Sequence, residues 1–134
     1  MKKILVAYDG SEPAKHALAE AADLAESMGA KMTVVSVVPV SPQRHLAVDP
    51  WDDRAVHAAE LKEAATLLRS RSVTWDVREP VGDPAMTIEQ IAEQGGYDMV
   101  VLGSRGKGAT ARFFQGSVSE HVATHSKATV VITR

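Results

Sequence analysis

The stretch MVVLGSRGKGATARFFQGSVS, residues 99–119, decides the fold of this chain. Residues 99–102 form an apolar run of the length of a buried strand, and a glycine-rich loop follows at once. The loop leads into Gly116 and Ser117, where a short helical segment over residues 117–125 begins. A strand that continues through such a loop into a helix is typical of α/β proteins that bind ligands at the carboxyl ends of their strands.

The same alternation of strand and helix extends along the rest of the chain. Apolar runs predict strands at residues 4–7, 32–38, 99–102 and 128–133, and alternating apolar and polar residues predict one at 73–78. Helices are expected between them, over residues 11–29, 52–69, 83–96 and 117–125. Ser11 and Asp83 are the expected N-caps, and Gly29 is the expected end of the first helix.

This order predicts an α/β fold: an open five-stranded parallel sheet with helices on both faces. Continuous apolar runs are typical of strands covered on both faces, whereas the alternating residues 73–78 suit an edge. We expect the strand order 3-2-1-4-5, with the topological switch point between the first and fourth strands. No repeat or low-complexity tract is visible, so residues 1–134 are expected to form a single domain.

Composition narrows the function classes. The chain has 134 residues, 45% of them hydrophobic, and a formal net charge of −2, so no basic surface for nucleic acid is indicated. It has no cysteine, which excludes disulfides, thiol catalysis and cysteine-bound metals. The first apolar run, residues 4–7, is shorter than the roughly 7–15 residues of a secretory signal core. We therefore expect a cytoplasmic protein without membrane insertion.

The glycine-rich loop has two features that suit a phosphate. Gly103, Gly106 and Gly108 have no side chains, so backbone N–H groups there can approach an anion closely. Gly116 and Ser117 stand at a helix start, where unpaired N–H groups and the helix dipole favour negative charge. Phosphate binding is one interpretation of this loop, and simple turn formation with a capping serine is the other.

Other side chains near the loop are compatible with a bound nucleotide. Arg105 and Lys107 add positive charge, and Ser119 adds a hydroxyl donor. Asp9 ends the first strand, so it faces the same crevice as the loop if the first and fourth strands are neighbours. An acidic residue there suits a ribose hydroxyl or a metal-bridged triphosphate.

The loop also carries a family resemblance. Gly103 and Gly106, separated by two residues, then nine residues, then Gly116 and Ser117 form the pattern G-x2-G-x9-G-[ST]. The pattern resembles that of the ATP-binding branch of the universal stress protein family. The opening ILVAYDGSEPA and the segment VGDP at residues 81–84 are similar to other parts of that family, so the resemblance covers the whole chain.

This resemblance implies a Rossmann-like fold of the adenine-nucleotide α-hydrolase type and a nucleotide-dependent regulatory role in stress tolerance, with slow ATP turnover at most. It implies ATP as the ligand, with Mg²⁺ held mainly by the phosphates, and a homodimer. The residues implied to hold phosphates and ribose are Gly103, Arg105, Gly106, Gly116, Ser117, Val118 and Ser119. Those implied to line the adenosine side are Ala7, Asp9 and Val37. No catalytic residue and no metal ligand from the protein are implied.

The last strand independently favours a dimer. In the order 3-2-1-4-5 both strands 3 and 5 are edges, and residues 128–133 contain the uncharged apolar run Val130-Val131-Ile132. An apolar edge strand usually needs a cover or a partner. We therefore predict a homodimer built on residues 128–133.

Several alternatives remain open. A nucleotide-independent interaction module of the same fold is the main one, and a slow ATPase or an enzyme that phosphorylates itself on Ser117 or Ser119 is another. His121 and His125, four residues apart on one helix, could share a metal ion, but no third ligand is evident and a solvated helix face is the simpler interpretation. His57 stands in a polar helical setting that indicates no function.

Overall fold

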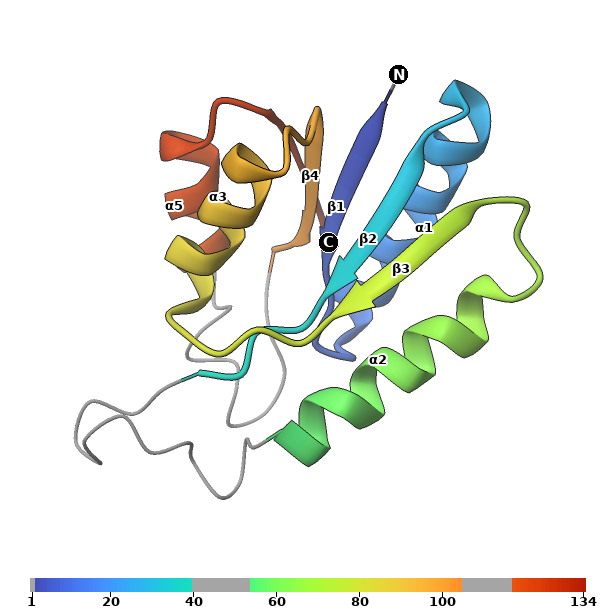
Figure 1. Ribbon diagram of the computed structural model, residues 1–134, viewed down its shortest axis with the longest axis horizontal. Coiled ribbons are helices and arrows are strands. Elements are labelled where there is room, and N and C mark those ends of the chain that lie inside the picture. The colour runs from blue at the N-terminus through green and yellow to red at the C-terminus, as the bar shows by residue number, and fades with distance from the viewer. Residues whose placement is uncertain (1, 40–53, 105–116) are drawn as a thin grey trace.

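The computed structural model describes residues 2–39, 54–104 and 117–134, in which strands and helices alternate (Figure 1). The strands are β1 (Lys3–Ala7), β2 (Lys31–Val35), β3 (Thr74–Arg78), β4 (Met99–Gly103) and β5 (Thr129–Thr133). The helices are α1 (Glu12–Met28), α2 (Arg54–Leu68), α3 (Pro84–Gln94) and α5 (Ser117–His125). The predicted α/β class is therefore confirmed.

The five strands form one sheet in the order β3-β2-β1-β4-β5, and every neighbouring pair is parallel. The predicted order and switch point are confirmed. β1 lies in the middle, with Leu5 opposite Thr33 of β2 on one side and Val100 of β4 on the other. The chain leaves β1 toward β2 and returns to the other side of β1 as β4, so the carboxyl ends of β1 and β4 are where a ligand crevice is expected in an open parallel sheet.

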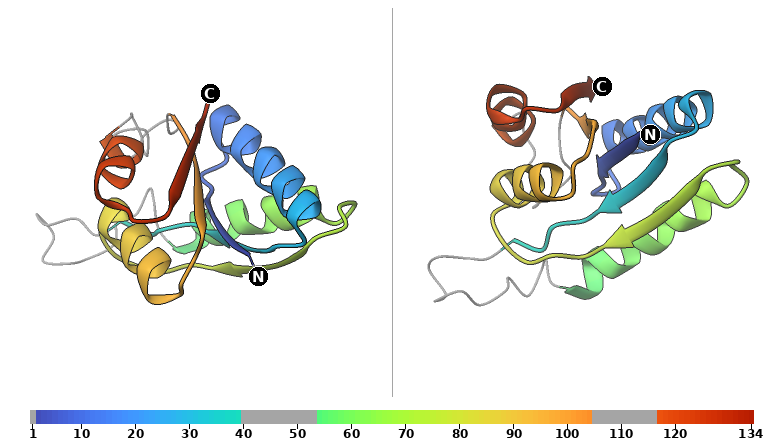
Figure 2. Two further views of the ribbon diagram at one scale, coloured as in Figure 1. Left: turned by 90° about the horizontal axis from the view of Figure 1, so that it is seen from above. Right: turned by 45° about the horizontal axis from the view of Figure 1, so that its top comes forward.

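Helices cover both faces of the sheet (Figures 1 and 2). Helices α1 and α2 pack with residues such as Ile4, Val6 and Met32 in one apolar cluster. Helices α3 and α5 pack with Leu5, Val100 and other residues in a second cluster on the opposite face. Successive residues of β1 thus point alternately into the two cores, because side chains of a strand alternate between its faces.

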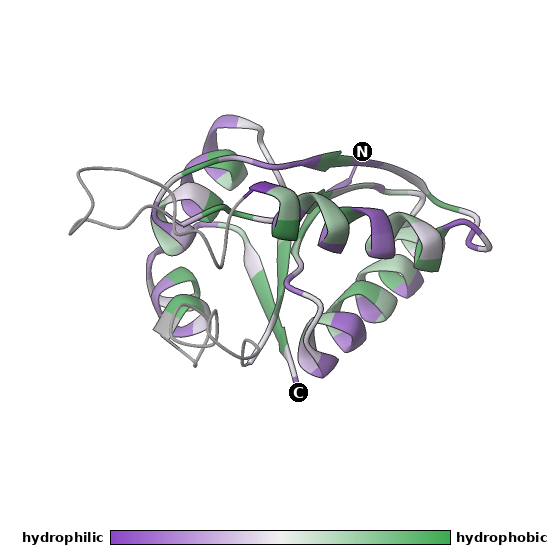
Figure 3. Cartoon of the chain, turned by 90° about the horizontal axis from the view of Figure 1, so that it is seen from below, coloured by the Kyte–Doolittle hydropathy of each residue, from purple (hydrophilic) through white to green (hydrophobic). Residues whose placement is uncertain are grey.

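The helices begin and end where the sequence indicates. The Ser11 side chain caps α1 by accepting a hydrogen bond from the Ala14 N–H at 3.2 Å, and Gly29 ends it with a φ of 64°. Asp83 caps α3 by accepting from the Met86 N–H at 3.0 Å. Hydropathy changes around the helices from hydrophobic toward the sheet to hydrophilic outside, as Figure 3 shows.

The second strand is shorter than predicted, since β2 ends at Val35 rather than at residue 38. The apolar run continues because Val37 and Val38 are buried, but only Val38 resumes pairing, through an isolated bridge to Val81. The backbone N–H of Val38 donates to Pro80 O at 2.8 Å, and the N–H of Gly82 donates to Val38 O at 3.0 Å. The continuous apolar run over residues 32–38 therefore indicates that these residues are buried, but it does not indicate one unbroken strand.

The two edges of the sheet differ. β3 is an edge, as predicted, and four of its five residues are exposed. β5 is the other edge and is only partly covered, because Val131 packs against the core while Ile132 is 44% exposed. The continuous apolar run of β5 therefore does not indicate a strand that is buried on both faces. Within the described residues, no helix is long and apolar enough to cross a membrane.

Candidate functional site

The candidate site lies at the carboxyl ends of β1 and β4. β1 leads into Asp9, and β4 leads into Ser104, whose backbone N–H donates to Thr133 O at 2.7 Å. Because these two strands are parallel neighbours, the segments that follow them emerge at the same edge of the sheet. The structure thus brings Asp9 and the start of the glycine-rich loop to one edge, as the sequence predicts.

Asp9 is the most informative side chain at this edge. It is 2% exposed, and its Oδ1 accepts a hydrogen bond from the Ser11 N–H at 3.0 Å. Its Oδ2 is shielded from solvent and accepts no hydrogen bond from any described residue. A buried carboxylate oxygen without a donor is costly, so Asp9 Oδ2 is the polar atom at this edge that an added hydrogen-bond donor would stabilise most.

Helix α5 begins at the same edge. It connects the carboxyl end of β4 to the amino end of β5, so its first residue, Ser117, lies on the side of the sheet where β1 ends. Val118 and Ser119 are both 5% exposed, which fixes the first turn against the body of the protein. The N–H groups of that turn and the helix dipole make this end favourable for an anion.

Apolar residues line the face of the sheet below this edge. Ala7, Val37 and Val118 belong to one buried cluster, which also contains Leu102. Ala7 is the last residue of β1, and Val37 follows the end of β2. Three of the residues implied on the adenosine or ribose side therefore lie in a single apolar cluster beneath the crevice.

Gly103 has a structural reason to be glycine. A Cβ atom at this position would lie 2.9 Å from both Pro13 C and Ala14 N, which are backbone atoms of the first turn of α1. Such contacts are too short for real Cβ atoms, and backbone atoms cannot move aside easily. Gly103 therefore allows α1 to pack closely against the end of β4.

A model of the universal stress protein family matches residues 1–134. The chain belongs to the universal stress protein family. A universal stress protein of Synechocystis sp. is 33% identical, with 98% of this chain and 97% of that protein aligned. A putative universal stress protein of Staphylococcus epidermidis is 31% identical, with 99% of this chain and 84% of that protein aligned. The family resemblance inferred from the sequence is confirmed.

Solved structures of universal stress proteins share the fold. One from Archaeoglobus fulgidus superimposes with a TM-score of 0.80 at 23% identity, over 100% of this chain and 99% of that one. Another is described as a complex with cAMP and has a TM-score of 0.76 at 23% identity, over 99% and 97% of the two chains. A third, from Arabidopsis thaliana, is described with AMP bound and has a TM-score of 0.71 at 22% identity, over 99% and 91%.

The predicted site of this universal stress protein is only partly within the described residues. Ala7, Asp9, Val37, Gly103, Val118 and Ser119 lie at or beneath the crevice, and Ser117 begins α5. Arg105, Gly106 and Gly116 lie outside the described residues. Their roles therefore stay predictions from the sequence pattern.

Tyr8 connects the crevice to helix α2. Its ring belongs to the α1–α2 side of the sheet, opposite to its neighbour Ala7, and it is 1% exposed. Its hydroxyl donates to Glu63 Oε1. Burial and this hydrogen bond, together with the negative charges of Glu63, Glu60 and Asp9, raise the pKa of Tyr8 far above its usual value. The phenol therefore remains neutral and links the end of β1 to α2.

A buried polar network that the sequence did not predict lies next to this link. His57, assigned to a polar setting, is fully buried, and Ser36 and Glu60 are 1% and 5% exposed. Ser36 Oγ donates to Glu60 Oε1 at 3.0 Å and is hydrogen-bonded to His57 Nδ1. One signal was available, because His57 precedes Leu61, Ala64 and Leu68 by four, seven and eleven residues and so shares their buried helix face.

The geometry of this network excludes one chemical interpretation. A serine-histidine-carboxylate triad places serine on one imidazole nitrogen and the carboxylate on the other. Here Ser36 Oγ and Glu60 Oε1, the latter at 3.1 Å, both lie against His57 Nδ1. These three side chains therefore do not form a triad among themselves, and their hydrogen bonds join the segment after β2 to α2.

Proposed function

We propose that this universal stress protein binds ATP at the carboxyl ends of β1 and β4 and acts as a nucleotide-dependent regulatory module in stress tolerance. The observation that carries the proposal is the buried Asp9 Oδ2, which accepts no hydrogen bond from a described residue. A ribose hydroxyl supplies the donor that this oxygen lacks, and a metal ion on the phosphates would supply a positive charge.

The surroundings of Asp9 match the parts of an adenine nucleotide. The buried Ala7, Val37 and Val118 offer apolar contact to the base, and the first turn of α5 offers N–H donors to the phosphates. Gly103, Arg105, Gly106, Gly116, Ser117 and Ser119 complete the proposed phosphate and ribose contacts by their place in the sequence pattern. Mg²⁺ would be held mainly by the phosphates.

The named relatives support an adenine nucleotide as the ligand class. Family structures described with cAMP and with AMP bound have the same fold as this chain. The described residues around Asp9 offer binding groups but no second acidic or basic side chain positioned as a general base. We therefore propose a ligand that is sensed and turned over slowly at most, in preference to a substrate that is consumed rapidly.

Mass spectrometry of small molecules retained through native purification tests this proposal. ATP, or ADP from its slow turnover, is the expected compound, at an amount approaching one per chain. Retention of no nucleotide, combined with no uptake of added ATP, would favour the alternative of a nucleotide-independent interaction module.

We also propose a homodimer formed through β5. The support is the exposed Ile132 on an edge strand that carries no charged residue. A two-fold partner that pairs or packs the same strand would cover this edge symmetrically.

A further inference from the structure

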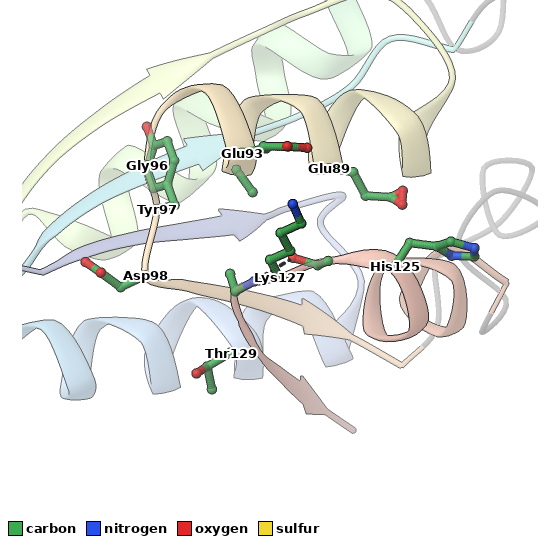
Figure 4. A pocket seen from close by; sticks show the side chains of 11 residues that line it. Glu89, Glu93, Gly96, Tyr97, Asp98, His125, Lys127 and Thr129 are labelled. Atoms are coloured by element: carbon green, nitrogen blue, oxygen red, sulfur yellow. Dashed lines mark hydrogen bonds between the residues drawn. The ribbon is translucent and has the colours of Figure 1, made fainter.

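Helices α3 and α5 bring three metal-binding side chains together, away from the crevice. Glu89 is in the middle of α3, and His121 and His125 are one turn apart on α5. One possible ligand atom from each residue lies within 4.8 Å of the other two. In Figure 4 the side chains of Glu89 and His125 extend toward the same end of a cavity between the two helices, whose volume is about 610 Å³.

We propose that Glu89, His121 and His125 bind a divalent transition-metal ion, with Zn²⁺ as the ion that suits them best. Zinc bonds to imidazole nitrogen and carboxylate oxygen are about 2.0–2.2 Å long, so two ligand atoms on one ion are roughly 3–4 Å apart. The three ligand atoms lie within 4.8 Å of one another, so the side chains would have to draw only somewhat closer around an ion.

The Glu89 carboxylate has an oxygen atom available to bind such an ion. Glu89 Oε1 is shielded from solvent and accepts no hydrogen bond from a described residue. His121 Nδ1 is 3.0 Å away, a distance that makes an ion pair only when the imidazole is protonated, and no hydrogen bond joins the two atoms. A cation bound by both His121 Nδ1 and Glu89 Oε1 would give the buried oxygen a partner, and the two atoms are already close enough to share one.

The second histidine has one nitrogen that is not used by the protein's own hydrogen bond. His125 Nδ1 lies 2.9 Å from His121 O, and because a carbonyl can only accept, Nδ1 carries the proton. The other nitrogen, Nε2, then has the free lone pair that a metal requires. Metal-binding histidines commonly donate their second N–H to a backbone carbonyl, which fixes the tautomer and the ring orientation. The two rings are stacked, with their centroids 4.2 Å apart, so both imidazoles stand on one side of α5.

The local charges favour a cation overall. Glu89 and Glu93 of α3 line the cavity, and Glu120 is the residue before His121. Lys127, which lines the cavity too, is the opposing charge. His125 is in the last turn of α5, where the negative end of the helix dipole attracts positive charge.

The ligand set selects the class of metal. Two imidazoles with one carboxylate suit Zn²⁺, Co²⁺, Ni²⁺ or Cu²⁺, whereas Mg²⁺ and Ca²⁺ prefer oxygen ligands only. Three protein ligands leave at least one coordination position for water or an external ligand. A bound ion would connect α3 to α5 and stabilise the folded state.

Zinc titration of the full chain, freed of nucleotide and of metal by chelation, tests this inference. Calorimetry with ZnCl₂ should show one ion per chain, and zinc should raise the melting temperature. His125→Gln and Glu89→Gln should each weaken zinc binding by at least the roughly 10–100-fold that the loss of an outer-shell partner costs. His16→Gln, which changes an exposed histidine on α1, should bind zinc as the wild type does. Magnesium should give no comparable heat.

Cobalt provides a direct readout of the coordination. Co²⁺ added to the wild type and to His16→Gln should give visible absorption bands that are lost in the double variant His121→Gln/His125→Gln. Zinc binding that persists at wild-type affinity in the double variant would overturn the assignment. Loss of binding only in His45→Gln, a histidine outside the described residues, or an absence of saturable binding would overturn it too.

Discussion

At the scale of single residues, Asp9 and Gly103 lie at the same edge of the sheet, and a different physical reason accounts for the residue type at each position. Asp9 keeps a buried carboxylate oxygen without a hydrogen bond from the described residues, an arrangement that costs stability unless a ligand compensates. Gly103 is required by close packing, since the backbone of Pro13 and Ala14 occupies the space of a side chain. The same glycine therefore belongs to the sequence pattern of the loop and to the contact between α1 and β4.

We predict that Gly103→Ala lowers the free energy of unfolding by about 1–3 kcal/mol, because the added methyl group forces backbone atoms apart. Urea denaturation of the nucleotide-free protein measures this. Gly82→Ala is the matched control, because its Cβ would meet only the terminal Oγ1 of the Thr87 side chain, which can rotate away. Equal stability of Gly103→Ala and the wild type would show that the packing is looser than described.

At the scale of secondary-structure elements, the Tyr8–Glu63 hydrogen bond holds α2 to the end of β1. Burial, the hydrogen bond to Glu63 and nearby carboxylates raise the pKa of Tyr8. A group whose pKa is raised on folding stabilises the protein fully below its unfolded pKa, which is about 10 for tyrosine, and loses this contribution as the pH rises further. The contribution of Tyr8 is therefore complete at neutral pH.

We predict that Tyr8→Phe costs about 1 kcal/mol at pH 7, through loss of the hydrogen bond to Glu63. Above about pH 10 the wild type should lose stability more steeply than the variant, because only the wild type has a buried phenol that must ionise on unfolding. Chemical denaturation across the alkaline range measures both slopes. Parallel slopes would contradict the account of the Tyr8 environment.

The elements themselves were largely predictable from the sequence. Caps such as Ser11 and Asp83 act through local hydrogen bonds, and the period of the apolar residues identifies buried strands, so both are visible in the sequence. The end of β2 was not, because Val37 and Val38 are buried for tertiary reasons after regular pairing stops. Burial and strand pairing coincide often, but they are separate properties.

The candidate site was predictable where residues are close in sequence and harder to predict where α2 or α3 contributes. Asp9 and Ser117 follow from strand ends and helix starts. Glu89 beside His121, and Ser36 beside His57, depend on how helices pack across long sequence separations. The spacing of His121 and His125 gave two of the three proposed metal ligands, and only the packing of α3 on α5 gave the third.

At the scale of the whole molecule, the two sheet edges have different consequences. β3 carries Thr74, Asp76 and Arg78, which discourage pairing with another chain, whereas β5 has no charged residue. We predict a homodimer that Ile132→Lys converts to monomer with its fold intact, because this side chain is 44% exposed. Light scattering and circular dichroism measure the two properties.

Val77→Lys is the control for the dimer, since Val77 is 42% exposed on the opposite edge. It should leave the oligomeric state unchanged. A wild type that is monomeric at micromolar concentration, or a dimer sensitive to Val77→Lys and not to Ile132→Lys, would contradict the use of β5.

The whole molecule should also be a slow catalyst at most. We predict ATP turnover well below the ~1–10³ s⁻¹ of typical enzymes, because the described part of the crevice provides binding groups without a positioned base. Phosphate release measures the rate, and mass spectrometry of the intact chain detects phosphorylation of Ser117 or Ser119. Rapid hydrolysis that Asp9→Asn abolishes would establish an enzyme instead.

Calorimetric titration of nucleotide-free protein with ATP and Mg²⁺ tests the central claim most directly. The wild type should show saturable binding, and Asp9→Asn should weaken it by about 1–3 kcal/mol while the nucleotide-free variant still folds. Asp23→Asn, which changes an exposed aspartate on α1, should bind ATP normally. A flat wild-type titration up to millimolar ATP, or undiminished affinity in Asp9→Asn, would contradict a nucleotide site built on Asp9.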